Sequence, residues 1–149
     1  MKKQLSVLFL CTGNSCRSHM AEAITNHFLP EKWKAVSAGT KPSGYVHPKA
    51  LQVLNEIGID HQGESKLADH FREHSFDLVI TVCDSAAEEC PIWLGKGKKT
   101  HIGFEDPAEA EGSEEEILTV FRTVRDQIQD QILSELERQY SILQNPMED

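Results

Sequence analysis

Short apolar runs alternate along the chain with stretches in which apolar residues recur at helical spacing. The runs are rich in residues that favour strands. The third run is apolar at almost every position, which is typical of a strand buried on both faces of a parallel sheet. We therefore expect four strands, at Leu5–Leu10, Lys34–Ser37, Phe76–Val82 and Thr100–Phe104.

The apolar residues between these runs predict amphipathic helices. The expected helices cover Ser18–Phe28, Pro48–Ile57, Leu67–Glu73 and Ser113–Gln139. Ser18 is a favourable residue to cap the first helix, and Gly58 is a favourable residue to end the second. Ser113 and Glu116 have the spacing of a capping box at the start of the long last helix.

Strands that alternate with helices favour an α/β fold. We expect a single-domain open parallel four-stranded sheet with helices on both faces. The chain has 149 residues, the length of one domain, which we assign to residues 1–140 with a C-terminal tail at 141–149. Ligands of such sheets bind at the carboxyl ends of the strands, where Cys11 and Cys83 both lie.

Composition and charge narrow the class of protein. Apolar residues make up 39% of the chain and charged residues 26%, as in an ordinary soluble domain. The net charge of −9 argues against binding to nucleic acid or to an anionic membrane surface. The first apolar run is too short for a signal peptide or a membrane span, so we expect a cytoplasmic protein.

The chain has four cysteines, and an intracellular protein uses such residues for catalysis or metal binding more than for a disulfide framework. The spacings are Cys-x4-Cys and Cys-x6-Cys, without the Cys-x2-Cys of a zinc knuckle, so we expect no metal site. The seven histidines form no His-x3-His pair within a predicted helix, and we expect them at the surface or partly buried.

The first candidate site is the segment between the first strand and the first helix. A tight loop there presents backbone N–H groups and a helix N-terminus to one small volume, which suits an anion. Gly13 and Asn14 tolerate a positive φ, and Arg17 offers a planar fork of donors for an oxyanion. The same field favours the thiolate of Cys11, a candidate nucleophile. The expected oxyanion-binding residues are Thr12, Gly13, Asn14, Ser15, Cys16, Arg17 and Ser18.

The second candidate site is the pair Cys83 and Cys90, which is followed by Pro91. The residues between them, Asp84–Glu89, are good helix formers, and on an intact helix the two Cα atoms would lie about 10.5 Å apart. A disulfide needs Cα atoms within about 7 Å, so the two can bond only if the segment unwinds or bends. This geometry suits a thiol relay that changes shape on oxidation, although the two cysteines can also be unrelated, one in the core and one at the surface.

The third candidate is Asp106, which precedes Pro107. An oxyanion attacked by Cys11 loses an oxygen, and that oxygen needs a proton from a nearby carboxylic acid. The other reading is an ordinary Asp-Pro turn, which is frequent in proteins.

Together these motifs resemble the low-molecular-weight tyrosine phosphatase superfamily, and within it the thioredoxin-coupled arsenate reductases. The loop from Cys11 to Ser18 resembles the phosphate loop of the superfamily, and Cys83 with Cys90-Pro91 resembles the reductases. The resemblance extends from about Leu5 to Tyr140. His19 and Glu105 depart from the family pattern.

The resemblance implies a phosphatase-like fold and the reduction of arsenate to arsenite. Cys11 would attack arsenate held by the loop and Arg17, and Asp106 would protonate the leaving oxygen. Two disulfides would follow in order, Cys11–Cys83 and then Cys83–Cys90, and thioredoxin would reduce the second. Cys16 would be structural. Phosphate and sulfate would compete with arsenate, and no cofactor would be tightly bound.

Two other functions stay open. A phosphatase of phosphotyrosine or small aryl phosphates would use the same loop, but the chain has no aromatic residue directly after Asp106-Pro107 to hold a substrate ring. A non-catalytic oxyanion sensor or redox switch would bind the ion without turnover. The sequence also leaves open the physiological reductant, the oligomeric state and whether a monovalent cation sits near the loop.

Overall fold

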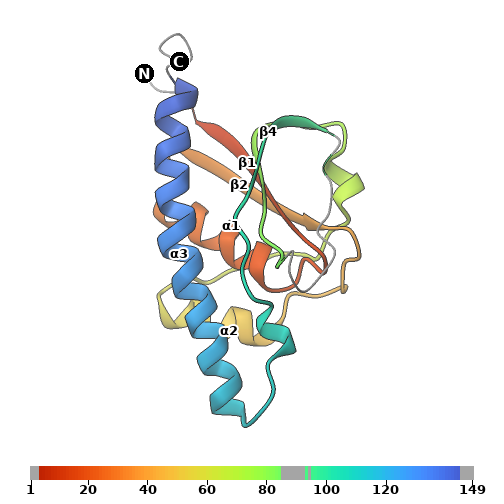
Figure 1. Cartoon of the computed structure of the whole chain (residues 1–149), viewed down its shortest axis with the longest axis vertical. Helices are drawn as coiled ribbons and strands as arrows, with labels where there is room; N and C mark the ends of the chain where they lie inside the picture. Colours follow the sequence, from red (N-terminus) through yellow and green to blue (C-terminus); the bar gives the residue numbers. More distant parts are fainter. Residues whose placement is uncertain (1–3, 85–92, 94, 145–149) are drawn as a thin grey trace.

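Four parallel strands form one sheet in the order β2-β1-β3-β4 (Figure 1). The chain is seen here as a computed structural model that describes residues 4–84, 93 and 95–144. The strands are β1 (Leu5–Cys11), β2 (Trp33–Gly39), β3 (Ser75–Thr81) and β4 (Lys96–His101). The predicted α/β fold with an open parallel four-stranded sheet is therefore confirmed.

Helices connect and cover the strands. In the part of the chain that the structure describes, the α-helices are α1 (Arg17–Phe28), α2 (Pro48–Glu56) and α3 (Glu114–Gln144). The same part of the chain also contains the short 3-10 helices η1 (Ala68–Phe71) and η2 (Pro107–Glu109). Within the described residues, no helix is long and apolar enough to cross a membrane.

The two faces of the sheet carry separate apolar clusters, because successive side chains of a strand point to opposite faces. Val7 and Phe9 of β1 lie in the larger cluster, which also holds buried apolar residues of the three α-helices. Leu8 and Leu10 lie in the smaller cluster, together with Phe71 of η1. The sheet is thus buried on both faces, which explains the almost continuous apolar runs of its central strands.

Several element ends differ from the predicted ones. The first helix begins at Arg17, with Cys16 at the cap position and no side-chain cap, so the expectation that Ser18 caps it is wrong. The segment 67–73 forms only the 3-10 helix η1. The fourth strand covers Lys96–His101 rather than Thr100–Phe104, since its pairing with β3 begins at Ser75. Charged residues are common on such edge strands, and they weaken the sequence signal.

The remaining boundaries agree more closely. Gly58 follows α2 with a φ of +85°, the conformation expected just after a helix end. The capping box at α3 is confirmed, since Ser113 and Glu116 exchange side-chain to backbone hydrogen bonds of 3.1 Å. Helix α3 continues to Gln144, four residues into the expected tail. The helix expected over 84–89 lies, apart from Asp84, outside the described residues.

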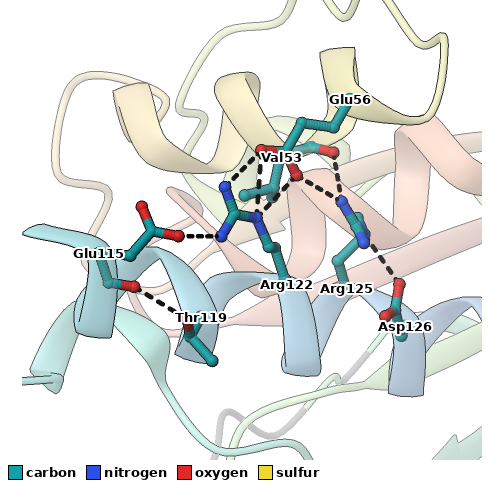
Figure 2. Close-up of polar contacts among 7 residues, drawn as sticks. All are labelled: Val53, Glu56, Glu115, Thr119, Arg122, Arg125 and Asp126. Carbon is teal, nitrogen blue, oxygen red and sulfur yellow. Dashed lines mark hydrogen bonds and ion pairs between the residues drawn. The ribbon is translucent and has the colours of Figure 1, made fainter.

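Helices α2 and α3 are joined by a charged cluster at their contact, which Figure 2 shows. The carboxylate of Glu56, at the end of α2, accepts hydrogen bonds from Arg122 at 2.8–3.1 Å and from Arg125 at 2.9 Å. Arg125 also donates to the carbonyl oxygen of Val53 at 2.9 Å. The cluster fixes α2 against α3, and α2 follows the segment that supports the oxyanion loop.

The order of the strands places the end of β1 at the point where the chain changes direction across the sheet. Strand β1 pairs with β2 on one side and with β3 on the other. Connections from β1 and β2 therefore leave toward opposite edges, and the carboxyl end of β1 is the position at which sheets of this kind bind ligands. Cys11 is the last residue of β1.

Candidate active site

Cys11 lies at the mouth of the loop, at the end of a central strand. Cys11 is only 2% exposed, and its thiol is free. The Sγ atom lies 2.9 Å from the Oγ atom of Ser18, which is fully buried in the first turn of α1. The Ser18 hydroxyl, which does not cap the helix, thus holds the thiol of the candidate nucleophile.

Asn14 stabilises the loop from inside. It is fully buried and has a φ of +46°, a conformation that asparagine tolerates better than most residues. Its Nδ2 atom donates to the hydroxyls of Ser18 at 2.9 Å and Ser37 at 3.0 Å, and its Oδ1 atom accepts from the Lys66 amide at 2.7 Å. These hydrogen bonds tie the loop to α1, to β2 and to the segment around Lys66. Gly13, expected to share the positive φ, does not adopt it.

The carbonyl oxygens of the loop bond to the segment that follows β2. Each accepts a hydrogen bond of 2.9–3.0 Å from a backbone amide: Thr12 from Lys41, Gly13 from Ser43 and Ser15 from His47. Gly39, at the end of β2, permits this close packing, because a Cβ atom there would clash with backbone atoms of the loop, the Asn14 nitrogen among them at 2.9 Å. The outward carbonyls fit a loop that turns its amides toward an anion.

Arg17 and Asp106 meet at the site although 89 positions separate them in the sequence. Arg17 is 3% exposed and lies in the first turn of α1. It donates from NH1 to the carbonyl oxygen of Phe104 at 3.2 Å, and its NH2 lies 3.5 Å from Oδ2 of Asp106. The Asp106 side chain is 29% exposed, and its Oδ1 accepts from the Ala108 amide at 3.0 Å. The candidate acid is therefore held beside the candidate oxyanion donor.

Cys16 has a different environment from Cys11. It is 4% exposed, and burial, reinforced by the negative charge of Asp106, raises the pKa of its thiol to about 12. Such a cysteine stays protonated at neutral pH and is a poor nucleophile. This environment fits the structural role that the resemblance implies.

Cys83 follows β3, the strand that pairs with β1 on the side away from β2. The pairing extends past the strand ends, since the Val82 amide donates to the Leu10 carbonyl at 2.8 Å, so Cys83 follows at the edge that carries Cys11. Cys83 is fully buried and disulfide-bonded, whereas Cys11 and Cys16 are free thiols. The predicted Cys11–Cys83 bond is thus absent from this state, and Cys90 lies outside the described residues.

Several residues that support the oxyanion loop lie outside the predicted motifs. Ser37 donates from its hydroxyl to Oε1 of Glu22 at 2.8 Å, and Ser65 donates to the Gly13 carbonyl at 3.1 Å. The Lys66 amide bonds to Asn14. For Ser37 the sequence offered one signal, because this residue lies near the end of β2, the strand that pairs with β1 beside the oxyanion loop. No local pattern marks the segment 65–66, because only the tertiary fold brings it to the loop.

A pair of histidines lies next to this network. His19 is fully buried, contrary to the expectation of a surface or partly buried residue. Its Nδ1 atom lies 2.9 Å from Nε2 of His61, and its Nε2 lies 3.0 Å from the Glu64 carbonyl. Burial is the main cause that lowers the pKa of His19 to about 3 and that lowers the pKa of His61. Both rings are therefore neutral at pH 7.

Known proteins are similar to this chain in sequence and in fold. The family model described as low molecular weight phosphotyrosine protein phosphatase matches residues 6–141. The arsenate reductase of Shouchella clausii is 43% identical over 129 residues, which are 86% of this chain and 91% of that protein.

Solved structures of arsenate reductases are also similar to this chain in fold. A structure of an arsenate reductase in its oxidized state has a TM-score of 0.74 and 30% identity, over 91% of this chain and 99% of that one. The thioredoxin-dependent arsenate reductase of Corynebacterium glutamicum has a TM-score of 0.58 and 26% identity, over 90% of this chain and 62% of that one.

Proposed function

This chain belongs to the low molecular weight phosphotyrosine protein phosphatase family, and we propose that it is an arsenate reductase that takes its electrons from thioredoxin. Relatives of similar length, that of Shouchella clausii among them, are named arsenate reductases, and one structural neighbour is a thioredoxin-dependent arsenate reductase. The observation that carries the proposal is Cys83, a buried, disulfide-forming cysteine beside the Cys11 loop. A phosphatase needs no second redox thiol, whereas the reduction of arsenate needs two electrons.

The first step uses the loop, Arg17 and Asp106. The loop amides and the guanidinium hold the arsenate oxygens, and the Cys11 thiolate forms a bond to arsenic. One arsenate oxygen leaves with a proton from Asp106. The bound oxyanion competes with Phe104 and Asp106 for Arg17, and this exchange frees the Asp106 carboxyl to act on the leaving oxygen.

The second step is the electron transfer. The thiolate of Cys83 attacks Sγ of Cys11, the electron pair of the sulfur–arsenic bond passes to arsenic, and arsenite is released. A Cys11–Cys83 disulfide forms. Cys90 then attacks Cys83, which frees Cys11 as a thiolate and leaves a Cys83–Cys90 disulfide. Thioredoxin reduces this last bond, and a cytoplasmic location would supply reduced thioredoxin. Phosphate and sulfate would compete for the loop.

A single-turnover experiment tests this order. The reduced wild-type protein, Cys83→Ser and Cys90→Ser are each mixed with excess arsenate, and arsenite is counted per protein. Cys90→Ser should release about one arsenite and stop with Cys11 and Cys83 linked, as peptide mapping would show. Cys83→Ser should release none. With thioredoxin, thioredoxin reductase and NADPH, only the wild type should turn over continuously.

Hydrolysis of p-nitrophenyl phosphate is the matched control, because it needs the loop and no relay. Both variants should retain the wild-type rate, which would show that their loops are intact. If the wild type hydrolyses the aryl phosphate but releases no arsenite, the protein is a phosphatase. If it binds oxyanions and performs neither reaction, it is a sensor or switch.

A further inference from the structure

Two histidines and a glutamate meet beside the oxyanion loop, and the proposed reaction uses none of them. His19 and Glu22 are three positions apart on α1 and so share a face of the helix. His61 comes from the loop after α2. Among the described residues, these three offer ligand atoms that all lie within 4.8 Å of one another.

We propose that His19, Glu22 and His61 form a binding site for a divalent transition-metal ion of the Zn²⁺ class. Two imidazole nitrogens and one carboxylate oxygen are a donor set that zinc takes in proteins, with a fourth position for water. The two ring nitrogens are 2.9 Å apart, and Oε2 of Glu22 is 3.9 Å from Nε2 of His61. Metal–nitrogen bonds of about 2.0–2.1 Å in a tetrahedral site need nitrogens about 3.3 Å apart, so only a small adjustment is required.

The groups around the ligands orient them as metal ligands are usually oriented. The Glu64 carbonyl can only accept, so Nε2 of His19 carries the hydrogen and its Nδ1 lone pair faces His61. His61 binds the metal through Nε2 once its hydrogen resides on Nδ1. The other oxygen of Glu22 accepts from the Ser37 hydroxyl at 2.8 Å, which leaves Oε2 for the ion.

Gly63 leaves the approach to the ligands open. A Cβ atom at this position would lie 2.6 Å from Nε2 of His61 and 3.0 Å from Nδ1 of His19. Any other residue would therefore fill the space that the ion needs. Gly63 itself is exposed, whereas the side chains of His61 and Glu22 are 6% and 13% exposed, so the site is enclosed yet reachable.

The positive charge of Lys66 opposes the binding of a metal ion at this site. Its amine donates to the Glu64 carbonyl at 2.8 Å, and its positive charge contributes to the lowered pKa of His19 and His61. The Glu22 carboxylate offsets this charge. Lys66→Gln should therefore strengthen metal binding, the opposite of the effect expected from loss of a ligand.

Titration with Co²⁺ tests the site, because cobalt in a zinc site gives visible d–d absorption. The full chain is used in its oxidised form, without added thiol. We expect one Co²⁺ per chain, displaced by Zn²⁺, with no thiolate-to-cobalt charge-transfer band in the near ultraviolet. His61→Gln should weaken binding at least about 100-fold and Gly63→Ala at least about tenfold, since even outer groups cost 10–100-fold. His27→Gln, an exposed histidine on the same helix, should bind as the wild type does.

Three results would overturn the proposal. They are no Co²⁺ binding at millimolar concentration, a charge-transfer band that shows cysteine ligands, and equal affinity in the wild type and His61→Gln. His19 is buried in α1 and its variants could fail to fold, so the test rests on His61 and Gly63 in the loop. Circular dichroism and the melting temperature confirm that each variant is folded.

Discussion

Replacement of Asn14 by alanine should cost about 4 kcal/mol of unfolding free energy. The buried side chain makes three hydrogen bonds, to Ser18, Ser37 and the Lys66 amide, each worth about 1 kcal/mol. Alanine at a φ of +46° costs about 1 kcal/mol more than asparagine does. A loss of this size is large against the total stability of about 5–15 kcal/mol of an ordinary domain.

A glycine variant separates the two contributions. Asn14→Gly loses the same three hydrogen bonds, but glycine adopts a positive φ without steric cost. It should therefore be about 1 kcal/mol more stable than Asn14→Ala. Asn55→Ala, a change of the same size on the exposed face of α2, serves as the matched control and should stay within about 0.5 kcal/mol of the wild type.

Urea unfolding followed by tryptophan fluorescence measures these differences, because Trp33 is fully buried in the core. Arsenate turnover should also fall about tenfold or more in both Asn14 variants, since the hydroxyl that contacts Cys11 loses its anchor. The reasoning would be refuted if Asn14→Ala lost less than about 1 kcal/mol, or if it matched or exceeded the glycine variant in stability.

Three further predictions follow from single residues. Gly39→Ala should lower stability by about 1–3 kcal/mol and slow arsenate reduction, because the new methyl group would press on the backbone of the oxyanion loop; unchanged melting and turnover would contradict this. Iodoacetamide at pH 8 should alkylate Cys11 and spare Cys16, whose pKa is about 12; equal modification of the two thiols in tandem mass spectrometry would contradict this. Hydrogen bonds from Arg122 lower the pKa of Glu56, so the stability this carboxylate provides is present above its ordinary pKa and is lost as the pH falls through the lowered value. The urea midpoint of Glu56→Gln should accordingly lie below that of the wild type at pH 7 and approach it as the pH falls through the lowered pKa of Glu56, whereas a gap that persists in stronger acid would argue against the ion pairs.

The sequence by itself determined the local chemistry of the loop and the class of the fold. Apolar runs that alternate with helical spacing predicted the α/β sheet and the positions of its first three strands, and the Cys-x5-Arg spacing placed Cys11 and Arg17 on a strand–loop–helix unit. The capping box at Ser113 could be predicted because both partners lie within one helical turn. Each of these signals depends on residues close in the sequence, where spacing and conformation are directly linked.

Only the tertiary structure decided what meets across the sheet. Asn14 and Lys66 are bonded across 52 positions, and His19 contacts His61 across 42. No hydrophobic periodicity in the sequence predicts such pairs, since they depend on how β1, β2 and the loop after α2 are placed relative to one another. The fourth strand begins earlier than predicted for the same reason. Its register is set by pairing with β3 and not by its own lysine-rich sequence. Ser18 shows the same limit within the loop, since burial beside Cys11 and Asn14 makes its hydroxyl a support for the thiol and not a helix cap.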